Sequence, residues 1–86
     1  MMARRSRLQI YQDVLQAIKD GTEKPTLIMD RTRLPYSTLN NTLSLLVSQG
    51  NIEVSMASRR KLYRITQKGE NTLDYFEQFK PLFQLE

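Results

Sequence analysis

The segment Lys24–Gly50, KPTLIMDRTRLPYSTLNNTLSLLVSQG, decides the fold. Pro25 suits the first turn of a helix, and Pro35 must end one helix and can begin the next. We therefore expect two short helices, over residues 25–32 and 36–50. The apolar residues of the second helix share one face, and small polar residues occupy the other. The apolar set is Leu39, Leu43, Leu46 and Val47, and the polar set is Ser37, Asn41, Ser44 and Ser48, with Thr38 and Asn40 at its flanks.

This arrangement predicts a helix-turn-helix whose second helix presents its polar face to a DNA groove. The first of the two helices should bury Ile28 and Met29, with Leu27 as a further candidate. Tyr36 should pack its ring near the buried edge and direct its hydroxyl to solvent or a phosphate. Leu45 projects from the polar side, where it would contact a neighbouring element or a partner.

Composition restricts the function. The chain has 86 residues and a net charge of +4, with no cysteine and no histidine. One small domain is expected, without disulfides, thiolate chemistry, the usual zinc sites or histidine-based catalysis. We therefore expect no enzyme activity and no cofactor, and no small-molecule ligand is evident. No apolar run is long enough to span a membrane, and the lack of cysteine fits a protein of the reducing cytoplasm.

The flanking segments predict support for the helical pair. A first helix should run from Ser6 or Arg7 to about Asp20, with Gly21 as its left-handed cap. Its apolar stripe, which we expect in the core, is Leu8, Tyr11, Val14, Leu15 and Ile18. After Gly50 the apolar period becomes two, which predicts strands over residues 51–55 and 62–66 joined by a loop over 56–60. This hairpin must lie against the helices to be stable.

The C-terminal segment predicts a last helix, with Thr66 as its cap and Gly69 in its first turn. Pro81 should kink or end this helix near Phe79–Lys80. An aromatic stripe follows the helical period and is too apolar to face water entirely, so part of it should pack on the first helix and part on a partner. The predicted dimerisation residues are Tyr75, Phe76, Phe79, Leu82 and Phe83.

Residues 36–49 contain no lysine or arginine, so the positive charge lies in the segments that flank the polar helix face. An N-terminal arm, the turn and the hairpin must therefore neutralise phosphates, while the helix offers Ser, Thr and Asn to base edges. The hairpin would lie along phosphates or insert an arginine into a minor groove. The predicted DNA-binding residues are Arg4, Arg5, Arg31, Arg33, Tyr36, Ser37, Thr38, Asn40, Asn41, Ser44, Arg59, Arg60 and Lys61.

An ordered set of short motifs runs along most of the chain. It comprises Arg5-Ser6, Ile10-Tyr11, Asp13, Leu15 and Ala17-Ile18, then Thr26, Ile28-Met29, Leu34, Tyr36, Leu39 and Leu43, and finally Tyr63, Ile65-Thr66 and Lys68-Gly69. This set resembles the archaeal winged helix-turn-helix family that includes the dimeric "ten-a" chromatin-associated proteins. Two departures are visible: Pro35 stands where the family has a capping serine, and the last helix is shorter than the family's long C-terminal helix.

The resemblance implies an α+β winged helix-turn-helix fold, with three helices, a two-stranded hairpin wing and a C-terminal helix. It also implies a homodimer that binds double-stranded DNA, as a transcription regulator or chromatin protein of an archaeon or of an archaeal virus or plasmid. The expected organisation is a basic arm over residues 1–6, the winged domain over 7–69 and a C-terminal helix over 70–86 that serves dimerisation.

Two other readings of the sequence stay open. Winged helices also serve as protein-interaction modules inside larger assemblies, and the uncharged third helix and the outward Leu45 favour this reading. The two basic clusters oppose it. The net charge would also suit RNA, although the sequence lacks the interleaved aromatic and basic residues that stack on bases. An enzyme finds no support, because no nucleophile–base pair or phosphate-cradling loop is visible.

Overall fold

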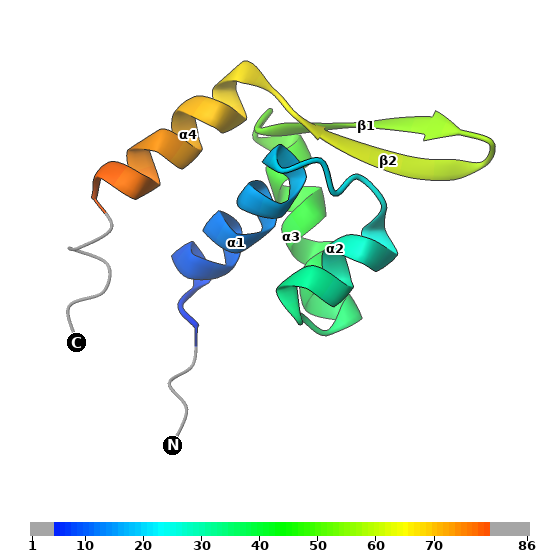
Figure 1. Ribbon diagram of the computed structural model, residues 1–86, viewed down its shortest axis with the longest axis horizontal. Coiled ribbons are helices and arrows are strands. Elements are labelled where there is room, and N and C mark those ends of the chain that lie inside the picture. Colours follow the sequence, from blue (N-terminus) through cyan, green and yellow to red (C-terminus); the bar gives the residue numbers. More distant parts are fainter. Residues whose placement is uncertain (1–4, 80–86) are drawn as a thin grey trace.

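The computed structural model describes residues 5–79, as four helices and a two-stranded antiparallel hairpin in the predicted order (Figure 1). The elements are α1 (Arg7–Lys19), α2 (Pro25–Thr32), α3 (Tyr36–Ser48), β1 (Ile52–Ala57), β2 (Arg60–Ile65) and α4 (Gln67–Gln78). In Figure 1, α1 lies between α4 and the α2–α3 pair, and the hairpin extends away on the side opposite α4. None of these helices is long and apolar enough to cross a membrane.

One hydrophobic core takes side chains from all six elements. The apolar face predicted for α3 is confirmed, since Leu39, Leu43 and Leu46 are all buried. The hairpin contributes Ile52 and Tyr63, which explains how two strands alone can be stable. The largest fully buried side chains are Leu15, Ile28, Leu39, Leu46, Ile52, Leu73 and Val14.

Local capping signals place the helix ends where the sequence predicts them. Ser6 caps α1 and accepts a hydrogen bond from the Gln9 N–H, and Pro25 occupies the first turn of α2. Gly21, directly after the cap of α1, has a φ of 101°. The last helix ends at Gln78, in the region where an end or a kink was expected. These signals work because each satisfies helix-end groups that would otherwise lack partners.

The turn between α2 and α3 depends on three consecutive residues. Arg33 adopts the left-handed conformation (φ 59°, ψ 34°), and its N–H donates to the Met29 carbonyl. Leu34 is buried and anchors the turn in the core. Pro35 then begins α3, which has no side-chain cap. The first N–H groups of α3 therefore lack a side-chain acceptor from the capping residue.

The hairpin turn differs from the prediction. The predicted loop over residues 56–60 is wrong, because β1 continues to Ala57 and pairs it with Arg60. Only Ser58 and Arg59 lie between the strands, with φ values of 49° and 66°. Two successive residues with positive φ make the tight turns that suit twisted hairpins, and Asn-Gly usually marks them. The sequence lacks that signal, so the turn was not recognised.

Three predicted packing positions are also wrong. Leu8, Leu27 and Tyr36 are 40%, 53% and 66% exposed. Leu8 and Tyr36 lie in the first turns of α1 and α3, and Leu27 lies on the short α2. Periodicity assigns a residue to a face, but it does not tell where along the helix the packing partner ends.

The C-terminal end of α3 is built as a left-handed cap. Gly50 has a φ of 77°, and the Asn51 N–H donates to the Leu46 carbonyl at 2.9 Å, as in the Schellman arrangement. Two side chains at the start of α4 hydrogen-bond the next two carbonyls of the chain. The Lys68 ammonium donates to the Gln49 carbonyl and the Thr66 hydroxyl to the Gly50 carbonyl, both at 2.6 Å. The start of α4 thereby fixes the end of α3.

Asn51 sits at the centre of this junction, which joins α3, β1 and α4. It is only 4% exposed, its backbone carbonyl accepts from the Thr66 N–H, and its side-chain oxygen accepts from the Thr72 hydroxyl. Gly69 packs directly on the Asn51 carbonyl, because a Cβ at Gly69 would lie 2.0 Å from that oxygen. No side chain fits there without displacing backbone.

We expect Gly69→Ala to lower the free energy of unfolding by about 2–3 kcal/mol, because the added methyl group collides with backbone. In an open helix the same change would stabilise by about 1 kcal/mol. Urea unfolding followed by circular dichroism measures the difference. Asp74→Ala, on the exposed side of α4, serves as the control and should change little. A Gly69→Ala protein as stable as the wild type would contradict the close contact.

Candidate nucleic-acid interface

The polar face predicted for α3 is exposed to solvent. Ser37, Asn40, Asn41 and Ser44 are exposed, and Thr38 is half-buried at the flank. Thr42 is buried, and its hydroxyl donates a hydrogen bond to the Thr38 carbonyl at 2.8 Å. The helix thus offers short hydroxyl and amide groups and no formal charge.

Positive charge gathers beside this face, between the hairpin and the start of α2. Lys24, Arg60 and Lys61, which we name the wing-side basic cluster, line a pocket of about 480 Å³ together with Pro25 and Thr26. All three side chains belong to exposed residues. Because no side chain caps α2, its first backbone N–H groups add partial positive charge next to the cluster.

Lys24 was missed by the sequence analysis. It joins the cluster because the Tyr63 N–H donates to the Glu23 carbonyl at 2.9 Å, which ties β2 to the segment before α2. The Arg64 guanidinium also meets the Glu23 carboxylate at 3.4 Å. These contacts join residues far apart in the sequence, so no local sequence pattern could have predicted them.

Two of the predicted DNA-binding arginines occupy unusual backbone positions. Arg33 and Arg59 both have positive φ values, of 59° and 66°. For most residues with a Cβ, this conformation costs roughly 1–2 kcal/mol, a cost that glycine avoids. Both side chains are exposed. Arg33 thus presents a positive charge at the turn between α2 and α3, and Arg59 presents one at the tip of the hairpin.

Arg31, in contrast, is engaged within the protein. Its guanidinium pairs with the Asp20 carboxylate and also donates to the Thr22 hydroxyl at 3.1 Å. The Gln16 amide and then the Arg31 guanidinium hold the pKa of Asp20 below its ordinary value. Arg31 therefore links α2 to the end of α1, and its charge is largely compensated there.

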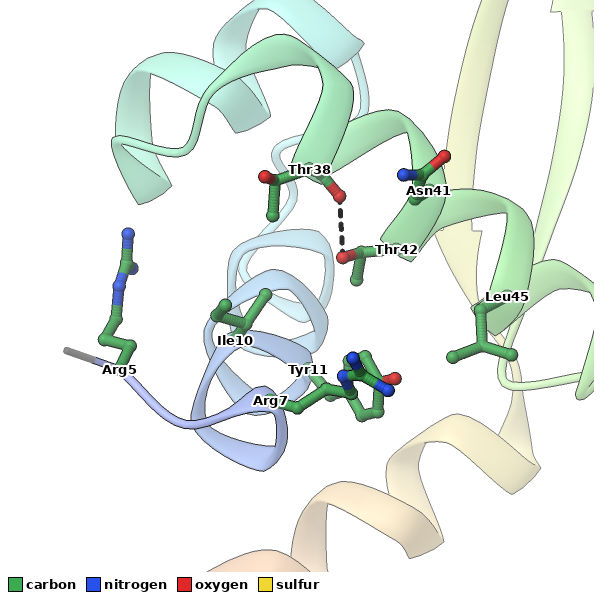
Figure 2. Close-up of a pocket in the computed structure, with 8 residues that line it drawn as sticks. All are labelled: Arg5, Arg7, Ile10, Tyr11, Thr38, Asn41, Thr42 and Leu45. Carbon is green, nitrogen blue, oxygen red and sulfur yellow. Dashed lines mark hydrogen bonds between the residues drawn. The ribbon is translucent and has the colours of Figure 1, made fainter.

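The N-terminal arginines lie on the other side of α3, away from the hairpin. Figure 2 shows Arg5 and Arg7, at the start of α1, beside a pocket whose opposite wall is α3. Arg5 also pairs with Asp13 at 2.9 Å. Arg4 lies outside the described residues. The pocket measures about 460 Å³, and we name it the α1–α3 pocket.

A smaller pocket separates α3 from the hairpin. It measures about 180 Å³, and its lining includes Tyr36, Asn40, Lys61 and Tyr63. Burial, and to a lesser degree the neighbouring Tyr36, raises the pKa of Tyr63. Tyr63 therefore stays a neutral phenol at physiological pH, and the only formal charge among these four side chains is the positive charge of Lys61.

The predicted dimerisation residues divide between core and surface. Phe76 packs against the hydrophobic core, while Tyr75 is 58% exposed. The rings of Tyr75 and Phe79 lie 4.7 Å apart between their centroids, so they form one aromatic surface on α4. Leu82 and Phe83 lie outside the described residues. In the described part of the chain, no group of three acidic, histidine or cysteine residues could hold a metal ion.

Several solved structures share this architecture. Sso10a-2, a DNA-binding protein from Sulfolobus solfataricus, aligns with a TM-score of 0.80 and 24% identity, over 91% of this chain and 81% of that chain. BpsR of Bordetella bronchiseptica, whose DNA binding is regulated by 6-hydroxynicotinic acid, aligns with a TM-score of 0.79 and 18% identity, over 88% of this chain. The aligned region spans only 57% of BpsR.

TubR from Bacillus thuringiensis serovar israelensis, in a structure bound to 24 bp of tubC, aligns with a TM-score of 0.66. The identity is 22%, and the alignment covers 80% of this chain and 78% of TubR. At these identities the likeness establishes the fold. A comparison with curated proteins found no match.

A family model described as "winged helix-turn-helix" matches residues 4–84, nearly the whole chain. The match agrees with the observed order of three helices, a hairpin and a further helix. The resemblance stated from the sequence and the predicted fold are both confirmed. The chain belongs to the winged helix-turn-helix family.

Proposed function

We propose that this protein binds double-stranded DNA, with α3 in the major groove and the hairpin wing on phosphates or in an adjacent minor groove. One observation carries the proposal: the exposed, uncharged face of α3 is flanked by exposed cations that belong to other elements. Sso10a-2 is a DNA-binding protein and TubR was solved on DNA, which supports the same use of this fold here.

The proposed contacts are of two kinds: phosphate contacts, which attract the DNA, and base contacts, which recognise its sequence. Phosphate neutralisation comes from Arg33, Arg59 and the wing-side basic cluster, with Arg7 on the far side of α3. Arg31 contributes little, because Asp20 compensates its charge. Asn40 and Asn41 can each pair with adenine, but arginine, the commonest reader of guanine, is absent from α3. Base discrimination is therefore modest, and A·T-rich DNA with a narrow minor groove is favoured.

The biological role that follows is a transcription regulator or chromatin-associated protein, in an archaeon or an archaeal virus or plasmid. The motif resemblance supports this source, and the modest base discrimination suits binding at many sites along the nucleoid. In this proposal the protein acts by binding DNA.

The active species in this proposal is a homodimer joined through α4. The Tyr75–Phe79 surface supports it, because exposed aromatic patches on a helix usually mark a contact. Two copies related by a two-fold axis would place their α3 helices on half-sites about one helical turn apart, roughly 34 Å.

We expect DNA affinity to fall steeply with salt, with a log–log slope of about −5 to −7 if a dimer contacts six to eight phosphates. Fluorescence anisotropy on a random-sequence duplex measures the slope. Lys24→Ala should reduce its magnitude by about two per dimer and weaken binding to all sequences alike. Lys19→Ala removes the same charge from the exposed end of α1 and is the matched control. A flat salt response would refute the proposal.

Arg59→Gly should change stability and DNA binding in opposite directions. Relief of the left-handed backbone raises the free energy of unfolding by about 0.5–1 kcal/mol, while the lost charge weakens DNA binding. Urea unfolding and anisotropy measure the two effects. Arg59→Lys keeps the charge and should keep most of the affinity. If Arg59→Gly lowered stability or left DNA binding unchanged, the functional reading of this turn would be wrong.

The dimer is tested by light scattering on a size-exclusion column. The wild type should elute with twice the mass of one chain, and Tyr75→Glu should elute as a folded monomer, because a charge would be buried in the contact. Asn71→Glu, also exposed on α4, introduces the same charge outside the aromatic surface. A wild-type monomer would remove the model of two half-sites.

A further inference from the structure

Met56, on β1, exposes an apolar side chain for which the packing of the fold gives no reason. It is 64% exposed, and among the large hydrophobic residues within 5–79 only Tyr36 is more exposed. Met56 takes no part in the hydrophobic core. Figure 1 shows the far half of the hairpin extending past the helices, so an apolar group there meets solvent unless a partner covers it.

The strand register shows which way Met56 faces. It is paired with Lys61, two residues before Tyr63 on β2. Directly paired residues share one face of a hairpin, and so does every second residue along a strand. Tyr63 is buried among the helices, so Met56 and Lys61 point to the same side of the hairpin as Tyr63. Lys61 also lines a pocket together with Asn40 of α3. Met56 therefore lies on the side of the wing where DNA bound to α3 is proposed to run.

Met56 and Lys61 are close neighbours as well as partners. The Tyr63 N–H donates to the Glu23 carbonyl, outside the hairpin, so Tyr63 and its strand partner do not exchange hydrogen bonds. Pairs with and without such bonds alternate along an antiparallel ladder, so Met56 and Lys61 also form a pair without them. The Cα atoms of such pairs are only about 4.5 Å apart, and their side chains lie close together. An apolar group thus stands directly beside a cation.

The far half of the hairpin carries positive charge alone. Residues 54–64 contain three arginines, one lysine and no acidic residue. Glu23 compensates Arg64, whereas no ion pair within residues 5–79 engages Arg59, Arg60 or Lys61. An apolar protein surface would leave these cations without partners. Duplex DNA offers phosphates to the cations, and the flat faces of its bases are apolar once a base step opens. The charge around Met56 therefore selects DNA as the partner that covers it.

We propose that Met56 is a wedge that enters the minor groove, partly unstacks one base step and kinks the DNA. This inference rests on the proposed function. Lys61 contacts a phosphate beside the opened step, and the unbranched, flexible side chain of methionine suits insertion between bases. Other proteins that bind the minor groove insert apolar side chains, methionine included, in this way.

The wedge gives a DNA preference that the wing arginines alone would not give. An arginine in a narrow minor groove favours A-tracts, which are narrow but stiff, whereas an inserted side chain favours TpA steps, which unstack easily. Two duplexes of equal length and equal base composition separate the two modes of binding. One has an A-tract at its centre, and the other has alternating T and A.

Fluorescence anisotropy at one salt concentration compares the two duplexes. We expect the wild type to bind the alternating duplex about threefold or more tightly than the A-tract duplex. Met56→Ala should lose this preference but keep its salt dependence, because no charge is removed. Met56→Leu should keep the preference. The matched control is Leu62→Ala, which removes a similar apolar group from the opposite face of the same hairpin. Equal affinities in the wild type, or a preference for the A-tract, would overturn the wedge.

The opened step is measured directly with a fluorescent adenine analogue that stacking quenches, placed in a TpA step of the alternating duplex. Energy transfer between dyes at the two ends of the duplex reports the bend. On binding the wild type, emission should rise and the duplex should bend by roughly 20° or more. Met56→Ala should bind without either change, and Leu62→Ala should produce both.

The outcomes separate the wedge from the proposed function. If the wild type binds both duplexes with the expected salt dependence but neither signal changes, the wedge is refuted and DNA binding stands. If the base stays stacked and Met56→Ala has a lower mass than the wild type on a size-exclusion column, Met56 contacts a second copy instead. Absence of binding to either duplex would refute both proposals.

Discussion

The position of α3 depends on one contact, the packing of Gly69 on the backbone carbonyl of Asn51. This contact lets α4 approach the end of α3 closely enough for Lys68 and Thr66 to donate hydrogen bonds to the carbonyls of Gln49 and Gly50, directly after that helix. It also buries Asn51, from which β1 begins. The orientation of α3, the root of the hairpin and the start of α4 are thus set at one junction.

In the proposed complex, the groups that attract DNA and the groups that contact its bases belong to different elements. The face of α3 has hydroxyl and amide groups, while the wing-side basic cluster, Arg59 and Arg33 supply charge from other elements. Because the junction joins α3 to the hairpin, it would set the distances between the proposed base-contacting groups and the proposed phosphate-contacting groups before DNA binds. Such preorganisation lowers the entropic cost of association.

Local chemistry predicted much of the fold. Ser6, Pro25, Gly21 and Thr66 act within one turn of the chain, and each marks a helix end where the structure has one. The turn at Ser58-Arg59 was missed because both residues adopt a conformation that their own preferences oppose. Such a conformation is visible only when the paired strands that impose it are known.

The proposed binding surface was predictable only in part. The exposed face of α3 follows from periodicity, because its polar and apolar residues alternate with the helical turn. Lys24 joins Arg60 and Lys61 through a tertiary hydrogen bond between Tyr63 and Glu23, and Arg31 is compensated by an ion pair across two helices. The position of Lys24 and the pairing of Arg31 both depend on contacts between segments distant in sequence. The distribution of charge along the sequence does not reveal such contacts.

The acidic side chains of α4 have a consequence for the proposed dimer. Glu70, Asp74 and Glu77 lie on that helix, and Figure 1 places it on the side of the molecule opposite the basic wing. The helical spacing turns Asp74 about 100° and Glu77 about 200° away from Tyr75, and the Glu77 carboxylate accepts a hydrogen bond from the Gln12 side chain at 2.8 Å. The proposed contact between copies is therefore apolar, so salt should affect it little while it weakens the hold on DNA, and a protein released from DNA by salt would remain a dimer.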